Sequence, residues 1–309
     1  MTEIPRMTGI IEAHGLVKTF GRVRALDGLD LSVSEGEVHG FLGPNGAGKS
    51  TTLRVLLGLM RASSGTASVL GLDPWTDLVQ THRDIAYVPG DVSLWPTLTG
   101  GECVDLLADL RGGVDDTLRA ELIRDFELDP KKKARSYSKG NRQKVALVAA
   151  FARPAKLYIL DEPTAGLDPV MESVFRRQVD RVKSAGATVL LSSHILSEVE
   201  ELCDRVTIIR AGKTVETGTL ASMRHLTRTS FRVTTTADAT GLASLAGVHD
   251  LRREADALVF DADTDRLPAV LAELTRLRLD DLRVSPTSLE ELFLRHYSDE
   301  VGDVPIGVA

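Results

Sequence analysis

The sequence is poor in cysteine, in aromatic residues and in long apolar runs. Only two of its 309 residues are cysteines, Cys103 and Cys203, and they form no C-x-x-C pair. This argues against a disulfide framework or a cysteine metal site and favours a reducing cytoplasm. No stretch approaches the roughly 18 apolar residues that cross a bilayer, and residues 1–7 are too polar for a signal peptide. We therefore expect any role at a membrane to depend on a separate partner.

An excess of positive charge is also missing. The net charge is −7, which argues against nonspecific nucleic-acid binding, so no nucleic-acid partner is expected. Three consecutive lysines at residues 131–133 are typical of a solvated loop. Hydrophobic residues make up 43% of the chain and charged residues 26%, which is enough for a buried core. The length permits two domains.

Short apolar runs alternate with helical patterns in the first half, which predicts an α/β domain with a buried sheet. Strands are expected at residues 10–20, 23–33, 37–42, 66–70, 85–88, 156–160, 188–191, 206–210 and 213–217. Helices are expected at residues 49–60, 171–183 and 195–203, and the segment 99–152 is mostly helical in pattern.

The composition changes near residue 225, where threonine becomes frequent. A strand is expected at 230–234 and helices at 267–277 and 288–297; the last begins with a capping box of Ser288 and Glu291. We therefore expect two domains, residues 8–224 and a small α+β appendage at residues 225–309.

Residues 43–50 fit the pattern G-x-x-x-x-G-K-[ST] between a predicted strand and a predicted helix. The glycines allow backbone N–H groups to point at phosphate oxygens, and the helix adds the positive end of its dipole. Lys49 supplies a charge for the β and γ phosphates, and the Ser50 hydroxyl a ligand for Mg²⁺. The predicted ATP-binding residues of this loop are Gly43, Pro44, Asn45, Gly46, Ala47, Gly48, Lys49, Ser50 and Thr51.

An apolar run at residues 157–160 ends in two acids, Asp161 and Glu162. At the end of a strand Asp161 can hold Mg²⁺, directly or through water. Glu162 points to the opposite side of the extended chain, where it can accept a proton from an attacking water. The pair predicts hydrolysis of the bound nucleotide.

With these motifs in order, residues 10–218 resemble the ATP-binding subunit of an ABC transporter. Residues 163–169 match the D-loop region of the family with Asp168, and His194 after a predicted strand matches its switch histidine. Phe20 matches the position whose ring stacks on adenine. The resemblance implies a P-loop NTPase fold with a RecA-like core, an antiparallel β layer and a helical subdomain at about residues 92–152.

Two motifs depart from the family pattern. The signature, normally L-S-G-G-Q, is Y-S-K-G-N here, so Ser138 and Gly140 are kept while Lys139 and Asn141 differ. In the family this segment contacts the γ-phosphate held by a second subunit. The usual glutamine after the strand at 85–88 is replaced by Gly90, followed by Asp91. Asp91 can substitute by binding water near Mg²⁺; the alternative is a relaxed loop without a chemical role.

The resemblance implies ATP hydrolysis in a homodimer or heterodimer, with Lys49, Glu162 and His194 as the catalytic groups. It further implies a transmembrane permease partner and a peripheral place on the inner face of the cell membrane. The apolar loop 91–99 is consistent with docking of the permease helices; the alternative is that Trp95 folds back on the core. The appendage is similar to the extension of drug- and antibiotic-export ATPases, so an exporter is expected. The alternatives are a soluble ATPase clamp on ribosomes or DNA and a nucleotide-binding regulator without turnover. A single phosphate loop, the lack of sustained heptads and Glu162 argue against them.

Overall fold

The chain folds into two compact units, Met1–Gly218 and Thr219–Ala309. The structure, a computed structural model, describes residues 9–220, 222, 228–235, 237, 240–263 and 266–286. The domain boundary expected between residues 224 and 225 and the helix expected at 288–297 lie outside these residues. No helix in the described part of the chain is long and apolar enough to span a membrane.

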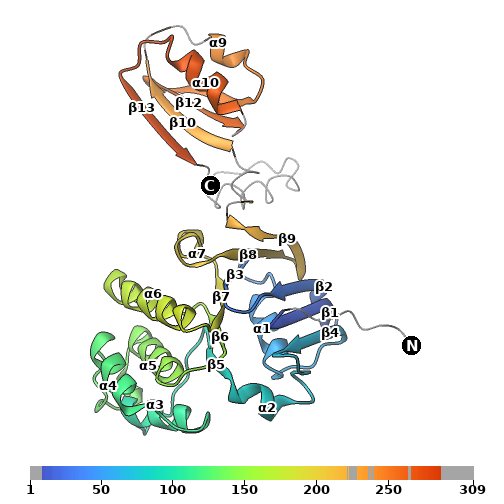
Figure 1. Ribbon diagram of the computed structural model, residues 1–309, viewed down its shortest axis with the longest axis vertical. Coiled ribbons are helices and arrows are strands. Elements are labelled where there is room, and N and C mark those ends of the chain that lie inside the picture. Colours follow the sequence, from blue (N-terminus) through green and yellow to red (C-terminus); the bar gives the residue numbers. More distant parts are fainter. Residues whose placement is uncertain are drawn as a thin grey trace, which may run out of the picture. The chain divides into compact units, whose positions relative to one another are not determined.

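The first unit is built around a six-stranded sheet with the order β5-β6-β7-β3-β8-β9 (Figure 1). Its strands are β3 (Val38–Leu42), β5 (Ile85–Val88), β6 (Leu157–Asp161), β7 (Thr188–Ser193), β8 (Arg205–Arg210) and β9 (Lys213–Thr219). The neighbours from β5 to β8 are parallel. Residues of β3, β6 and β7 are buried on both faces, as expected for a parallel sheet covered on both sides.

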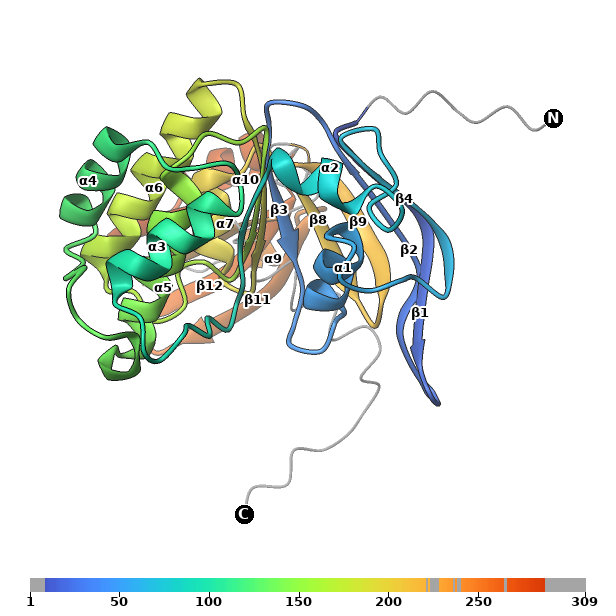
Figure 2. The same cartoon turned by 90° about the horizontal axis from the view of Figure 1, so that it is seen from below.

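A three-stranded antiparallel layer packs beside the central sheet. It contains β1 (Ile11–Phe20), β2 (Val23–Val33) and β4 (Ser64–Val69) in the order β2-β1-β4. Helix α1 (Lys49–Leu56) lies between this layer and the sheet, and its Leu53 and Leu56 share one core with Leu16 of β1 and Ile159 of β6. Figure 2 shows the antiparallel layer and the helical segment on opposite sides of the central sheet.

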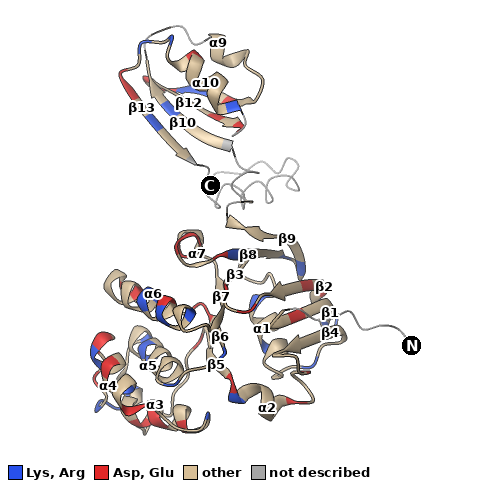
Figure 3. Ribbon diagram, viewed as in Figure 1, with Lys and Arg blue, Asp and Glu red and all other residues tan. Residues whose placement is uncertain are grey.

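Most other helices of the first unit cover the second face of the sheet (Figure 2). Helices α5 (Lys139–Phe151), α6 (Pro169–Ser184) and α7 (Leu196–Leu202) contact the sheet, α3 (Gly100–Asp109) and α4 (Asp116–Asp125) pack on α5, and α2 (Leu78–Arg83) lies near β5. Phe151 of α5 stacks on Tyr158 of β6 at a centroid distance of 5.3 Å, which joins the helical subdomain to the sheet. Figure 3 shows both charge signs interspersed along α6.

Several element ends differ from the sequence prediction. Helix α1 ends at Leu56 rather than at residue 60, because the chain turns at Gly58, whose φ is +64°. Helix α6 begins two residues early, because Asp168 caps it and Pro169 occupies its first turn. Helix α2 and strands β11, β12 and β13 were not expected from local patterns.

The second unit is a four-stranded antiparallel sheet in the order β11-β12-β10-β13. Its elements are β10 (Arg228–Thr234), α9 (Thr240–Ala243), β11 (Val248–Glu254), β12 (Ala257–Asp263), α10 (Leu267–Leu274) and β13 (Asp281–Pro286). This β-α-β-β-α-β succession is a split βαβ arrangement. Phe231 and Phe260 stack at 4.9 Å in a core shared with Leu242, Val270 and Leu274.

Candidate nucleotide-binding and catalytic site

The carboxyl ends of four neighbouring strands meet at one edge of the central sheet. In the strand register Leu42 of β3 pairs with Ser193 of β7, and Ser192 pairs with Asp161 of β6. Val88, the last residue of β5, pairs with Leu160. The ends of these strands and the segments that follow them contain the predicted phosphate-binding loop, both acids and His194, so the topology brings these residues together where α/β sheets bind ligands.

The phosphate-binding loop leads from β3 into α1 as predicted. Gly46 and Gly48 have φ values of +82° and +108°, which glycine adopts without a steric penalty. A side chain at Gly48 would meet the carbonyl of Ala25 at 2.9 Å, whereas Gly46 faces open space. The N–H of Gly212 donates to the carbonyl of Ala47 at 2.9 Å, so the β8–β9 turn supports the loop.

Lys49 lies at the centre of this site with only 5% of its surface exposed. Its ammonium donates to the carbonyl of Gly43 at 2.6 Å and approaches Glu162 Oε1 at 3.7 Å. Burial lowers the pKa of Lys49, while the Glu162 and Asp161 carboxylates act in the opposite direction. The lysine charge is thus held in a poorly solvated place, where it interacts strongly with an anion.

Asp161 is 5% exposed and accepts a short hydrogen bond from the Ser192 hydroxyl. The residues of the site fit Mg²⁺ held with a nucleotide, because Mg²⁺ commonly takes one or two protein carboxylates, phosphate oxygens and water. Among the described residues, no group of three or more His, Cys, Asp or Glu side chains could hold a metal ion by itself. Asp161 and Ser50 would hold the ion, which would neutralise charge on the β and γ phosphates.

Glu162 has an unusual backbone for a residue with a side chain. Its φ is +46°, a conformation that costs on the order of 1–3 kcal/mol in a non-glycine residue. Its N–H is held by the carbonyl of Ser192 at 3.0 Å and by the Ser192 hydroxyl at 3.2 Å. Its Oε1 lies 3.3 Å from His194 Nδ1. Glu162 therefore contacts the end of β7 and approaches both Lys49 and His194.

Gly90, which stands where the family usually has glutamine, lies beside Asp161. A Cβ at Gly90 would stand 3.3 Å from the Asp161 carbonyl and 3.4 Å from its Oδ2. Asp91, the next residue, is exposed. Behind this loop, burial and then the charge of Asp161 raise the pKa of Tyr87 to about 12, so the phenol stays neutral at physiological pH.

The signature segment opens helix α5. Ser138 caps the helix by accepting the N–H of Asn141 at 3.3 Å, and Lys139 is its exposed first residue. Gly140 packs so closely on the D-loop that a Cβ there would stand 2.4 Å from the Gly166 carbonyl. Within one chain, the signature and D-loop segments are therefore in contact.

Two other predicted site residues have local structural contacts as well. Asp168 caps α6 through hydrogen bonds of 3.0 Å from the N–H groups of Val170 and Met171. Phe20 ends β1 with 46% of its surface exposed, and the Lys18 ammonium lies 5.2 Å from its ring centroid. An exposed ring of this kind is available to stack on a base.

Sequence reasoning missed three residues that hold the site together. Ser192 contacts both acids at the end of β6. Gln143 is buried in α5 and donates to the Pro163 carbonyl at 2.9 Å. Glu198 of α7 accepts from the Ser193 hydroxyl at 2.7 Å. Buried polar side chains on otherwise apolar faces were the available signal, but only the fold shows their partners.

Comparison with known proteins agrees with this geometry. The ABC transporter family profile matches residues 26–165. The daunorubicin/doxorubicin resistance ATP-binding protein DrrA of Streptomyces peucetius is 35% identical over 93% of this chain and 92% of its own length. The linearmycin resistance ATP-binding protein LnrL of Bacillus subtilis is 32% identical over 92% of this chain and 97% of its own. The bacitracin transport ATP-binding protein BcrA of Bacillus licheniformis is 35% identical over 68% of this chain and 70% of its own.

Solved structures give the same fold. An ATP-binding subunit of an ABC transporter matches with a TM-score of 0.65 and 33% identity, over 70% of this chain and 92% of that one. A dimeric bacterial ABC transporter cassette matches with a TM-score of 0.62 and 25% identity, over 68% of this chain and 98% of that one. The expected P-loop NTPase fold and ATPase class are confirmed. This chain belongs to the ABC transporter family, as an ATP-hydrolysing, ATP-binding subunit.

Proposed function

We propose that this subunit powers an exporter of drugs or antibiotics through ATP-driven closure of a dimer. Support comes from relatives whose names specify drug or antibiotic resistance and whose similarity covers both units of this chain. The clamp on ribosomes or DNA is not favoured, because the relatives' names place them in membrane transport. The observation that carries the proposal is the approach of Lys49 and His194 to one Glu162 oxygen.

In this proposal each residue of the site has one task. The loop Gly43–Thr51 binds the phosphates of ATP, Phe20 stacks on adenine, and Ser50 and Asp161 hold Mg²⁺. Glu162 orients and activates the attacking water, and His194 hydrogen-bonds the γ-phosphate. Lys49 stabilises the charge that spreads over the γ-phosphate oxygens as the bond to the leaving group breaks.

The test is Glu162→Gln, which preserves size but removes the base. We expect ATP affinity to stay within about threefold and turnover to fall at least about 100-fold, the range typical of general-base loss. Glu121→Gln, on the exposed surface of α4, is the matched control. Unchanged turnover in Glu162→Gln would refute the assignment of the base.

A second subunit completes the site in this proposal. Ser138, Lys139, Gly140 and Asn141 lie at the start of α5, so its N–H groups and the lysine charge are suited to a partner's γ-phosphate. Asp168, at the start of α6, links the two sites. One solved relative of this fold is dimeric.

Asp91 is proposed to take over the role of the glutamine that Gly90 replaces. Asp91→Ala tests this: ATP turnover should fall if Asp91 has that role and stay unchanged if it does not.

The permease partner is proposed to dock in an apolar groove between the sheet and the helical subdomain. The groove has a volume of about 330 Å³, and Leu94, Trp95, Leu107 and Leu110 are among its lining residues. Trp95 is 45% exposed and Leu110 75%, so Trp95 is only partly folded back on the core. Docking there would place this chain peripherally on the inner face of the membrane. Leu110→Asp should abolish co-purification with a polytopic membrane protein and leave ATP binding intact.

A further inference from the structure

A half-buried glutamate lies behind the catalytic edge of the sheet, and the tasks proposed above do not include it. Glu198 is the third residue of helix α7, which follows the His194 loop. Its Oε1 is shielded from solvent and has no hydrogen-bond partner among the described residues, while Oε2 is bonded. A carboxylate in such a place costs free energy, because burial disfavours its charge. We therefore expect Glu198 to have a role that offsets this cost.

Glu198 acts directly on the turn that carries the switch histidine. The Ser193 hydroxyl donates to Glu198 Oε2 at 2.7 Å, and the same hydroxyl accepts the N–H of Ile195 at 2.9 Å. The two hydrogen bonds span His194, the residue between Ser193 and Ile195. Hydrogen bonds in such a chain polarise and strengthen one another. The backbone on both sides of His194 is therefore tied to Glu198.

The same carboxylate also faces the segment that follows the catalytic acid. Thr164, two residues after Glu162, lines one small cavity with Glu198, and the hydroxyls of Ser193 and Thr164 partly offset the rise in the pKa of Glu198 that burial causes. Thr164 is itself 8% exposed. The cavity has a volume of about 130 Å³ and is lined by Thr164, Glu172, Arg176, Ile195, Ser197, Glu198 and Glu201. It has room for water beside Glu198.

We propose that Glu198 is a positioning residue that holds the His194 turn against the segment carrying Glu162. The distance of 3.3 Å between His194 Nδ1 and Glu162 Oε1 depends on two loops after different strands. Glu198 hydrogen-bonds Ser193 of the first loop and lines one cavity with Thr164 of the second. This inference rests on the proposed roles of Glu162 and His194, and it extends the site to helix α7.

The test compares Glu198→Ala with Glu198→Gln in the purified full-length chain. Glu198→Ala removes the acceptor, so we expect kcat to fall about 10- to 100-fold, since small misplacements of catalytic groups cost this much. Affinity for a fluorescent ATP analogue should change less than about twofold, because the hydrogen bond of Glu198 goes to Ser193 in the His194 turn and not to the phosphate-binding loop. Glu198→Gln keeps an amide oxygen for Ser193 and should retain kcat within about threefold.

Controls separate this role from a purely structural one. Glu121→Ala, on the exposed surface of α4 and outside this cavity, should keep the wild-type kcat. In a Ser193→Ala background, Glu198→Ala should add little further loss, because the two residues act as one unit. Wild-type kcat in Glu198→Ala would overturn the inference, as would parallel losses of kcat, ATP affinity and melting temperature. Absence of hydrolysis in the wild type and in Glu121→Ala would instead overturn the proposed function.

Discussion

At the scale of single residues, the signature glycine is constrained within its own chain. Gly140 faces the Gly166 carbonyl so closely that any Cβ would overlap it at 2.4 Å. The Gly166 carbonyl is part of the backbone, and the φ of Gly166 is +82°. The carbonyl therefore cannot move away as the end of a flexible side chain would. Gly140 thus keeps the start of α5 in register with the D-loop, independently of any contact to a second subunit.

Gly140→Ala should therefore reduce both stability and activity. We expect the free energy of unfolding to fall by about 1–3 kcal/mol, as for other overpacked sites, and ATP turnover to fall at least about tenfold. Urea denaturation and an ATPase assay measure the two effects. Lys144→Ala, further along α5, is the control and should change neither. A Gly140→Ala protein with normal stability would contradict the close contact.

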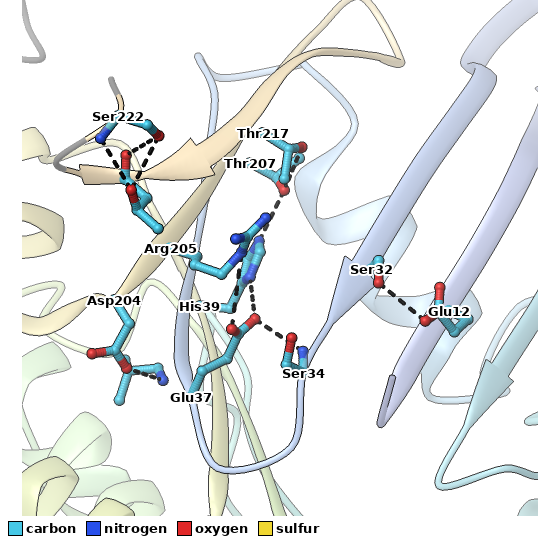
Figure 4. Close-up of polar contacts among 12 residues, drawn as sticks. Glu12, Ser32, Ser34, Glu37, His39, Asp204, Arg205, Thr207, Thr217 and Ser222 are labelled. Atoms are coloured by element: carbon cyan, nitrogen blue, oxygen red, sulfur yellow. Dashed lines mark hydrogen bonds and ion pairs between the residues drawn. The ribbon is translucent and has the colours of Figure 1, made fainter. Parts of the chain in front are cut away.

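At the scale of elements, a buried histidine joins three strands of the central sheet. His39 of β3 is fully buried and contacts Glu37 at 2.8 Å and Thr207 of β8 at 2.8 Å (Figure 4). The Thr207 hydroxyl in turn lies 2.9 Å from that of Thr217 on β9. Burial alone would raise the pKa of Glu37, but hydrogen bonds from His39 and the N–H of Ser34 lower it more.

The sign of this shift gives a pH prediction. Because the folded pKa of Glu37 lies below its ordinary value of 4.5, the carboxylate stabilises the fold above about pH 4.5. That contribution is lost as the pH falls through the lower, folded pKa. Glu37→Gln should lower the free energy of unfolding by about 1.5–3 kcal/mol at pH 7, the range for a hydrogen bond to a charged group, and flatten the loss of stability in acid.

Denaturant titrations between pH 3 and pH 7 measure this effect. The matched control is Glu35→Gln, because Glu35 is an exposed neighbour on the same turn. It should leave the pH profile unchanged. An equally steep acid limb in Glu37→Gln and in the wild type would show that Glu37 is not the responsible group.

At the scale of the whole molecule, each unit has its own hydrophobic core. The first contains residues of β1, α1 and β6, and the second is built around Phe231 and Phe260. No side chain of the second unit is assigned to the nucleotide site. Ligand binding to the folded first unit should therefore stabilise that unit alone.

Calorimetry of the Glu162→Gln protein should show two unfolding transitions. Mg-ATP at about 100 times its Kd should stabilise one of them by about 2.7 kcal/mol and leave the other unchanged. Phe231→Ala should lower the free energy of unfolding of the other transition alone, by about 3–5 kcal/mol. A single transition that shifts as a whole with both treatments would show that the two units unfold together.

The sequence by itself determined the chemistry and much of the first unit. The loop with Lys49 and the acids Asp161 and Glu162 were predicted from local patterns of a few residues, since strand ends and glycine turns are encoded locally, whereas His194 was predicted from the family resemblance. The second unit was predicted less completely, because β11, β12 and β13 carry few regular apolar repeats, and Leu282 and Val284 of β13 are exposed.

Only the tertiary structure decided how these residues meet. The approach of Lys49 and His194 to Glu162 depends on the register of β3, β6 and β7, strands far apart in the chain. The contact of Gly140 with Gly166 and the link from Glu198 to the His194 turn likewise join segments that no local pattern relates. Long-range packing sets such distances, because a parallel sheet is held together by strands that neighbour in space and not in sequence.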